Sequence, residues 1–282
     1  MKYVKSPLNY TGGKYKILAS ILPKFPQNIN TFVDLFGGGF NVGINVSAKK
    51  IIYNDHIPYL KDMFLYFKNN EDTINKIKGI ISEFELSETN KEGYIRLRER
   101  YNREKSILDL FTLTCYSFNH QIRFNSKHEF NTPFGKNRSS YNSKIENNLI
   151  EFINALKEKN IEFFSKDFNF LLEHNFKEND FVYCDPPYLI SNAAYNDGKR
   201  GFKDWGSREE EELLNLLDNL DKRKVKFMLS NVLEHKGKKN LQLIEWSKKY
   251  KVSEIEKDYK NCSYHLKVKE NKTKEVIIYN YC

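Results

Sequence analysis

The sequence has few of the residues that build disulfide frameworks or zinc sites. Its four cysteines (Cys115, Cys184, Cys262 and Cys282) are far apart, no Cys-x-x-Cys pair occurs, and the six histidines are scattered along 282 residues. Zinc sites use closely spaced Cys and His ligands, and small disulfide-bonded domains are rich in cysteine. We therefore expect no metal site and a reducing, intracellular compartment.

Long apolar runs are missing as well. No stretch approaches the roughly 20 apolar residues of a membrane span, and the first residues do not resemble a signal peptide. We expect a cytoplasmic protein with no membrane partner. Internal repeats and low-complexity segments are also absent, and the glycines near residue 12 do not fit a G-x-x-x-x-G-K-[ST] frame, which argues against a P-loop.

What is present is an apolar content sufficient for folding and a basic charge balance. Apolar residues make up 40% of the chain, and 46 Lys and Arg against 37 Asp and Glu give a net charge of +9. A chain of this length can bury one core, or one core with an inserted subdomain. The basic balance favours a polyanionic partner, but it fits a soluble protein from a lysine-rich proteome equally well.

Apolar strand-like runs alternate with helical patterns, which predicts an α/β domain with a mostly parallel sheet. The alternation breaks in the middle of the chain, where residues 57–118 are helical and charged and residues 117–138 are irregular, with a hairpin-like turn near 123–127. We predict one α/β domain of residues 1–56 and 146–282, interrupted by an insertion at 57–145. The predicted strands are 32–36, 50–54, 161–165, 181–184, 225–229 and 275–281.

One helix start and one loop stand out in the second half. Ser207 lies three residues before Glu210, which is the spacing of a capping box, and a leucine-rich helical pattern follows. The preceding loop, residues 189–206, is long and polar, as substrate lids often are.

A glycine-rich turn follows the first predicted strand. Gly37, Gly38 and Gly39 come directly after residues 32–36, and residues 40–44 look like a helix start, so the backbone can approach a ligand closely. Asp55 ends the next strand, 18 residues after Gly37, where an acid can bond both hydroxyls of a ribose. The two features together predict a nucleotide-type cofactor. The glycines alone would suit any tight turn, and NAD is the natural competitor.

The most informative segment is Asp185-Pro186-Pro187-Tyr188, which follows the apolar run 181–184. An acid, two prolines and an aromatic residue at the end of a buried strand make a rigid pocket floor that excludes water. From average residue usage, such a tetrapeptide is expected by chance in on the order of one chain in a thousand of this length.

In this order, the motifs resemble the Dam family of DNA adenine-N6 methyltransferases (class alpha), which use S-adenosylmethionine. The resemblance covers nearly the whole chain. It implies a Rossmann-like seven-stranded mixed sheet with an antiparallel last strand, and it implies that residues 57–145 form a mostly helical target-recognition domain containing a β-hairpin. The segments that carry it are 7–14, 34–39, 54–55, 166–168, 185–188 and, within the insertion, 123–125 and 129–135.

The resemblance also implies roles for individual residues. The catalytic residues would be Asp185, Pro186 and Tyr188. The cofactor site would comprise Tyr10, Lys14, Phe36, Gly37, Gly39, Asp55, Asp167, Phe168 and Asp185. The DNA contacts would be Asn9, Phe118, Asn119, Ile122, Arg123, Asn125 and Pro133. The chain departs from the family at Asn9, where close relatives of the Dam enzyme carry lysine, and at Asn119-His120, where Asn-Gly is usual.

The chemistry explains why these residue types are needed. The N6 amine of adenine is a poor nucleophile because its lone pair is delocalised into the ring. The carboxylate of Asp185 and the carbonyl of Pro186 can accept its two hydrogens, while Tyr188 stacks on the base. The sulfonium supplies the driving force, so neither a metal nor a covalent nucleophile is required. Cys184 is best interpreted as a small strand residue, since the Pro-Cys motif of cytosine-C5 methylation is absent.

An adenine inside a duplex must leave the stack to reach such a pocket. Phe118 either inserts into the duplex as a wedge or is a core aromatic residue. Arg123 either reads a guanine edge or contacts a phosphate, and Ile122 and Pro133 can touch a thymine methyl group. A few of the basic residues of the insertion are expected to contact phosphates. The candidates are Arg96, Arg98, Arg100, Arg103, Lys105, Lys127, Lys136 and Arg138.

The leading hypothesis is a site-specific DNA adenine-N6 methyltransferase that binds duplex DNA and releases S-adenosylhomocysteine. A GATC site, or another site containing GA, follows from the resemblance alone. The alternatives are N-methylation of cytosine N4, RNA adenine or protein glutamine, and a non-catalytic DNA-binding subunit. Action beside a cognate restriction endonuclease and solitary action both remain open, and we expect a monomer or a weak dimer.

Overall fold

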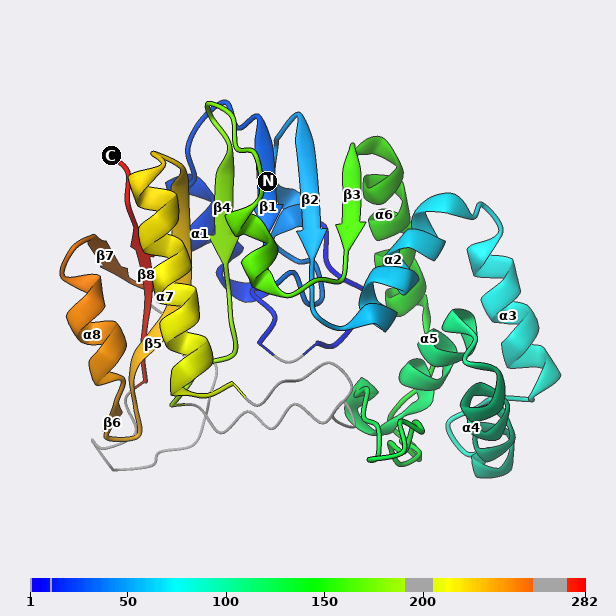
Figure 1. Ribbon diagram of the computed structural model, residues 1–282. Helices are drawn as coiled ribbons and strands as arrows, with labels where there is room; N and C mark the ends of the chain where they lie inside the picture. The colour runs from blue at the N-terminus through cyan, green and yellow to red at the C-terminus, as the bar shows by residue number, and fades with distance from the viewer. Residues whose placement is uncertain (1, 11, 191–204, 256–272) are drawn as a thin grey trace.

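The computed structural model describes residues 2–10, 12–190, 205–255 and 273–282 (Figure 1). Their strands form one eight-stranded sheet in the order β3-β2-β1-β4-β5-β8-β7, with the short β6 paired to β5. Strands β1 to β5 run parallel, whereas β8 is antiparallel to both β5 and β7. The strands are β1 (Thr31–Asp34), β2 (Lys50–Asn54), β3 (Ile161–Phe164), β4 (Phe181–Cys184), β5 (Lys226–His235), β6 (Lys238–Lys239), β7 (Lys251–Glu254) and β8 (Thr273–Tyr279).

This architecture confirms the expected mixed α/β methyltransferase sheet with its antiparallel final strand. Each strand predicted from the sequence is present, although β1 ends at Asp34, two residues early, and β5 continues to His235. The sequence analysis missed β6 and β7. Both are short, and the burial pattern of β7 is mostly exposed, so neither carries the apolar run that identifies a buried strand.

The central strands are buried on both faces, which explains their continuous apolar sequence. Along β4, Phe181 and Tyr183 enter one hydrophobic cluster, while Val182 and Cys184 enter the cluster on the opposite face. Helices α1, α2 and α6 contribute to the first cluster, and α7 and α8 contribute to the second. The α-helices outside the insertion are α1 (Leu18–Ile21), α6 (Ser143–Glu158), α7 (Ser207–Lys222) and α8 (Leu241–Ser247).

The predicted insertion contains most of the remaining helices, which lie beyond β3 at one end of the sheet (Figure 1). They are α2 (Pro58–Asn69), α3 (Thr73–Glu83), α4 (Lys91–Glu104) and α5 (Ile107–Tyr116). Around the predicted hairpin, only the isolated antiparallel bridges Phe124↔Phe130 and Ser117↔Phe134 form. Helix α2 packs against α6, and the first hydrophobic cluster continues from the sheet into the insertion. The boundaries at residues 57 and 145 therefore remain a prediction.

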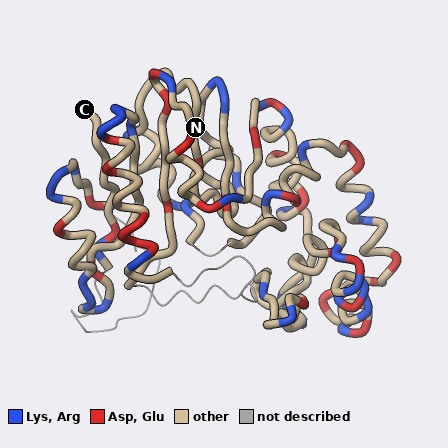
Figure 2. The backbone as a smooth tube through the Cα atoms, viewed as in Figure 1, with Lys and Arg blue, Asp and Glu red and all other residues tan. Residues whose placement is uncertain are grey.

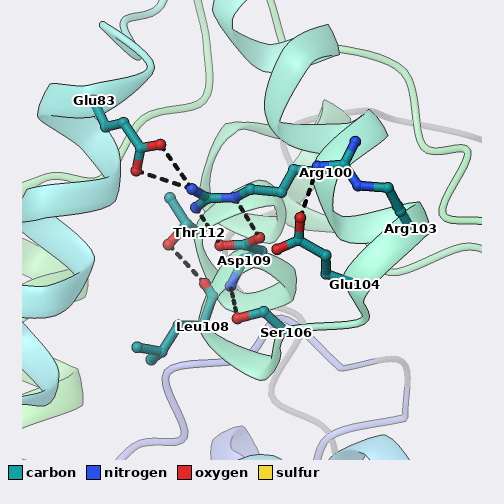
Figure 3. Close-up of polar contacts among 8 residues, drawn as sticks. All are labelled: Glu83, Arg100, Arg103, Glu104, Ser106, Leu108, Asp109 and Thr112. Carbon is teal, nitrogen blue, oxygen red and sulfur yellow. Dashed lines mark hydrogen bonds and ion pairs between the residues drawn. The ribbon is translucent and has the colours of Figure 1, made fainter.

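An ion-pair network joins three helices of the insertion (Figure 3). Arg100 of α4 donates to both oxygens of Asp109 in α5 at 2.7 and 2.9 Å, and to both oxygens of Glu83 in α3 at 2.8 and 2.9 Å. Asp109 is 2% exposed. The guanidinium of Arg100 is thus engaged by two carboxylates of the insertion, and its place among the candidate phosphate contacts stays a prediction. Figure 2 shows acidic and basic segments alternating along α3 and α4.

Two local predictions were wrong. Residues 40–44 do not begin an α-helix, because only the 3₁₀ turn η3 (Gly43–Asn45) forms there. Helix α7 begins at Ser207, but its N-cap is Gly206, whose N–H donates to Glu209 at 3.0 Å. The predicted pair of Ser207 and Glu210 is one residue out of frame, because the carboxylate of Glu210 is buried and binds elsewhere. Residues 191–204 of the predicted lid lie outside the described part of the chain. None of the described helices is long and apolar enough to cross a membrane.

Candidate functional site

The predicted catalytic and cofactor residues line one pocket at the carboxyl ends of β1, β2 and β4. Parallel strands present these ends at one edge of the sheet, so motifs far apart in the sequence meet there. The pocket wall includes Tyr10, Lys14, Phe36, Gly37, Gly39, Asp55, Asp167, Phe168, Asp185, Pro186 and Tyr188. The structure thus brings these side chains together, while their individual roles remain predictions.

The turn after β1 requires glycine at two positions. A Cβ atom on Gly37 would lie 2.4 Å from the ring of Tyr53, and Gly38 has a φ of +47°. Tyr53 in turn donates its hydroxyl to the carbonyl of Gly38 at 2.9 Å. A side chain at Gly37 would displace this buried ring, so the turn and the strand beside it are built as one unit.

Asp55 ties the same turn to the end of β2. One carboxylate oxygen accepts the N–H of Gly38 at 2.8 Å, and the other accepts the N–H of Ile57 at 2.9 Å. Burial raises the pKa of Asp55 to about 6, against the opposing effect of these two bonds. Each oxygen keeps a second lone pair, so the carboxylate can still accept hydrogen bonds from a ligand's hydroxyl groups.

Lys14 and Asp185 form a buried ion pair at the other end of the pocket. The ammonium lies 2.7 Å from Oδ2 of Asp185, and their side chains are 6% and 16% exposed. Burial alone would lower the pKa of Lys14, but Asp185, Tyr183 and Glu275 together outweigh that effect and the pKa is raised. Burial raises the pKa of Asp185, and Lys14 opposes this rise. Lys14 therefore stays cationic and holds one oxygen of Asp185 in place.

The sequence analysis missed a third charged group, Glu275 of β8. Its Oε1 lies 4.0 Å from the ammonium of Lys14 and 3.3 Å from the hydroxyl of Tyr188, which also lies 3.1 Å from Oδ1 of Asp185. The residue is 4% exposed. A signal was available in the sequence, since an acid inside an apolar strand is seldom buried without a partner. The partners, however, come from segments that only the fold brings together.

A fourth acid lies beneath the pocket floor. Asp34, at the end of β1, accepts the N–H of Gly43 at 3.0 Å. Burial raises the pKa of Asp34 to about 7, and the neighbouring carboxylates of Asp185 and Asp55 add to the rise. The pocket is therefore surrounded by more carboxyl groups than cations, which favours a ligand that carries positive charge.

The predicted DNA contacts lie near the pocket's amino-terminal segment and in the insertion. Asn9 donates to the carbonyl of Asn119 at 2.9 Å, and Phe118 donates its backbone N–H to Pro133 at 2.8 Å. Phe118 is 39% exposed and lies 4.7 Å from the guanidinium of Arg138. The core interpretation of Phe118 is therefore wrong.

The remaining predicted DNA contacts are arranged differently. Arg123 donates to the side-chain oxygen of Asn131 at 3.3 Å, and Ile122 is half-buried against the first hydrophobic cluster. Asn125 holds its own turn, because its oxygen accepts the N–H groups of Lys127 and Glu129 at 2.9 and 3.0 Å. Asn119 adopts a left-handed conformation with a φ of 55°, which asparagine tolerates better than most residues.

The pocket combines two kinds of chemistry. One end has a glycine turn and an acid suited to a ribose, and the other has a fixed carboxylate beside two prolines, suited to an amine donor. Such an arrangement can hold a nucleoside cofactor and align an amino group without a metal or a covalent intermediate.

Comparison with known proteins agrees with this geometry. A family model described as D12 class N6 adenine-specific DNA methyltransferase matches residues 10–273. The chain is 49% identical over 281 residues to the type II methyltransferase M.FokI of Planomicrobium okeanokoites, covering 99% of this chain and 43% of that protein. It is 32% identical over 252 residues to the type II methyltransferase M.MjaIII of Methanocaldococcus jannaschii, covering 81% and 84% of the two chains. It is 29% identical over 270 residues to a DNA adenine methylase of Haemophilus influenzae, covering 93% and 91%.

The chain spans less than half the length of M.FokI, whereas it matches most of the length of the other two relatives. The family match includes the glycine turn, the insertion and the Asp-Pro-Pro-Tyr segment, and it confirms the resemblance drawn from the motifs. The chain belongs to the D12 class N6 adenine-specific DNA methyltransferase family.

Proposed function

We propose that this chain transfers a methyl group from S-adenosylmethionine to N6 of an adenine in duplex DNA. The observation that carries the proposal is the shared pocket, in which residues 185–188 face the glycine turn and Asp55. A nucleoside cofactor and an amine-binding carboxylate are thereby within reach of one another. Membership of the family supports the same reaction.

Asp55 is the residue we assign to the ribose hydroxyls, and Phe36, Phe168 and the glycine turn to the rest of the nucleoside. When bound, S-adenosylmethionine supplies a methyl group activated by its sulfonium. The excess of carboxyl groups around Lys14 suits that positive charge. Tyr10 and Asp167 complete the assigned site, and we propose no metal for the reaction because alignment of the amine is sufficient.

Asp185 accepts one N6 hydrogen, and the carbonyl of Pro186 accepts the other. Lys14 fixes Oδ2 of Asp185 at 2.7 Å, so the oxygen near Tyr188 remains for the adenine. Two fixed acceptors stabilise the positive charge that develops on the nitrogen. Asp185 works as an orienting acceptor rather than a strong base, because Lys14 favours its ionised form.

The insertion supplies the DNA contacts in this proposal. An extruded adenine leaves a gap in the stack, and an exposed aromatic ring can fill it. Phe118 meets that requirement, since it is 39% exposed and held by its backbone bond to Pro133. The other candidates for base and backbone contacts are Asn9, Asn119, Ile122, Arg123, Asn125 and Pro133.

The type II names of M.FokI and M.MjaIII support action beside a cognate restriction endonuclease. The target sequence stays open, and GATC is not favoured by any observation in the pocket. We propose a monomer or weak dimer on the duplex.

The test is methylation of a plasmid by purified protein and labelled S-adenosylmethionine, followed by sequencing for modified bases. We expect N6-methyladenine at one short recurring sequence. Methyl groups on cytosine N4 or on RNA would favour the alternative substrates. Retention of DNA with no methyl transfer and no cofactor binding would favour a binding subunit.

A further inference from the structure

Three aromatic side chains meet on one wall of the pocket. Phe36 follows β1, Phe168 begins the 3₁₀ helix η5 (Phe168–Leu172), and Trp205 precedes α7. The ring of Trp205 lies 5.6 Å from that of Phe36 and 5.9 Å from that of Phe168, while the two phenylalanine rings lie 5.7 Å apart. Trp205 was not among the residues identified from the sequence. It lines the same pocket as Asp167 and the assigned ribose acid, Asp55.

A buried carboxylate holds this tryptophan. The indole N–H of Trp205 donates to Oε2 of Glu210 at 2.8 Å, and Glu210 is 0% exposed. The other oxygen, Oε1, accepts hydrogen bonds from Asn240 at 2.9 Å and from Asn231 at 3.4 Å. Asn240 is also the N-cap of α8. The network therefore anchors the indole to α7, α8 and β5 at once.

Burying a carboxylate costs free energy unless hydrogen-bond donors surround it. An apolar side chain would fill the space of Glu210 without that cost, so the carboxylate is better explained by the groups that it binds. Its partners here are neutral N–H groups, and one of them is the indole at the pocket wall. Because the bond fixes the ring plane, the free face of Trp205 is presented to the pocket in a defined orientation. Preorganised aromatic faces of this kind bind flat heterocycles.

We propose that Trp205, oriented by Glu210, forms the wall of the cofactor pocket that contacts the purine ring. The inference rests on the proposed function, since it assumes an adenosine-containing cofactor. It adds a binding residue, Trp205, and a positioning residue, Glu210, to the assigned site. The purine is enclosed by Trp205, Phe36 and Phe168, while Asp55 takes the ribose.

The second tryptophan of the chain provides a matched control. The sequence contains two tryptophans, Trp205 and Trp246. Trp246 lies in α8, donates to Asp218 at 2.9 Å and packs against Phe227 and Tyr250. It does not line the pocket. It shares with Trp205 an indole bonded to a carboxylate, but it has no contact with a ligand site.

The experiment measures binding of S-adenosylhomocysteine and of adenosine by calorimetry. Trp205→Ala is expected to weaken both by about 5- to 100-fold, because stacking on an aromatic side chain is lost. Trp205→Phe should lose less, since a smaller flat ring remains. Trp246→Phe should bind both ligands within about twofold of the unmodified chain. A parallel loss with adenosine shows that the purine half carries the effect.

Fluorescence gives a second, independent readout. In the Trp246→Phe variant Trp205 is the sole tryptophan, and a saturable change in its emission is expected as S-adenosylhomocysteine is added. Adding Glu210→Ala should make the indole more accessible to acrylamide before ligand is added. This measurement decides the question even if Trp205→Ala does not fold.

The outcomes separate the two claims. Equal ligand affinity for Trp205→Ala and the unmodified chain, or unchanged emission of Trp205 at saturating ligand, overturns the purine contact and leaves the proposed function intact. Failure of the unmodified chain to bind S-adenosylhomocysteine at all would remove the proposed function, and with it the inference.

Discussion

Two clusters in this molecule use the same ingredients, one cation between two carboxylates, for different ends. Arg100 joins Asp109 and Glu83 with two hydrogen bonds to each carboxylate, all between 2.7 and 2.9 Å (Figure 3). Lys14 contacts Asp185 at 2.7 Å but stands 4.0 Å from Glu275. In the first cluster both carboxylates are bound bidentately. In the second, the ammonium is too far from one of the two carboxylates for a hydrogen bond.

The difference follows from where each cluster lies. Arg100, Asp109 and Glu83 tie together α3, α4 and α5, and none of them lines the pocket. Lys14 and Asp185 do line it, with Glu275 directly behind. Arg100 is engaged on both sides by carboxylates of neighbouring helices, which fixes those helices in place, whereas Lys14 and Asp185 face a pocket that a ligand can enter. Position relative to the pocket, rather than charge, therefore distinguishes the cluster that joins helices from the one that we assign to the reaction.

The largest effect is expected in the pocket cluster, for Asp185→Ala. We expect methyl transfer to fall by at least about 10³-fold, because an acceptor aimed at the developing charge is removed. Affinity for DNA should change little, since the predicted DNA contacts are Asn9 and residues of the insertion. Turnover at the level of the unmodified chain, measured with labelled cofactor, would contradict the catalytic assignment.

The second largest effect is expected on stability, at Asp109→Asn. Removing one charge from a buried pair leaves Arg100 poorly compensated, although Glu83 remains, so we expect a loss of about 2–3 kcal/mol of unfolding free energy. The matched variant Glu83→Gln alters a side chain that is 57% exposed and should cost under about 1 kcal/mol. Urea unfolding measures both, and equal losses would show that burial does not decide the cost.

Arg123→Ala extends the comparison to a second arginine of the insertion. Arg100 donates to two carboxylates, but the guanidinium of Arg123 donates one hydrogen bond, to the side chain of Asn131, among the described residues. The other N–H groups of the Arg123 guanidinium can donate to the edge of a base. The variant should therefore lose about 1–3 kcal/mol of discrimination between target and mismatched sites. Its binding to unrelated DNA should change much less.

The control for that experiment is Arg103→Ala, whose exposed guanidinium pairs with the neighbouring Glu104. It should leave sequence choice unchanged. Competition binding at fixed salt distinguishes the two. A uniform loss across all DNA sequences in Arg123→Ala would show that Arg123 contacts only phosphate.

The part of the site that the sequence could predict is the part carried by local motifs. The glycine turn, Asp55 and residues 185–188 each follow a strand, and the rule that parallel strands meet at one edge is enough to place them together. Glu275 and Trp205 have no such motif. Each becomes meaningful only through partners distant in sequence, Lys14 and Tyr188 for the first, and Phe36 and Phe168 for the second.

The same limit explains the errors in the fold. The N-cap of α7 was misassigned because Glu210 lies three residues after Ser207, just as Glu209 lies three residues after Gly206. Only the fold shows that the carboxylate of Glu210 accepts a hydrogen bond from Trp205 instead. The sequence shows the charge of Arg100, which makes it a candidate phosphate contact. Only the fold shows that Asp109 and Glu83 face its guanidinium.

The smallest effect is expected for Glu275→Gln, which removes one charge of the pocket cluster. The charge of Glu275 contributes to the raised pKa of Asp185, because a nearby negative charge disfavours a second one. Removing it lowers the pKa of Asp185. Since the ionised carboxylate is the acceptor for the amine, activity should persist to lower pH, and the acid limb of the rate profile should move to lower pH.

A merely structural role for Glu275 would give a different result. Lost packing would reduce turnover equally at every pH, whereas loss of the charge moves the limb and leaves the rate near neutral pH within about threefold. Glu254→Gln in β7 is the matched control, since its side chain is 62% exposed and pairs with Lys274 away from Tyr188. An acid limb that stays in place in Glu275→Gln would mean that the charge of Glu275 does not act on Asp185.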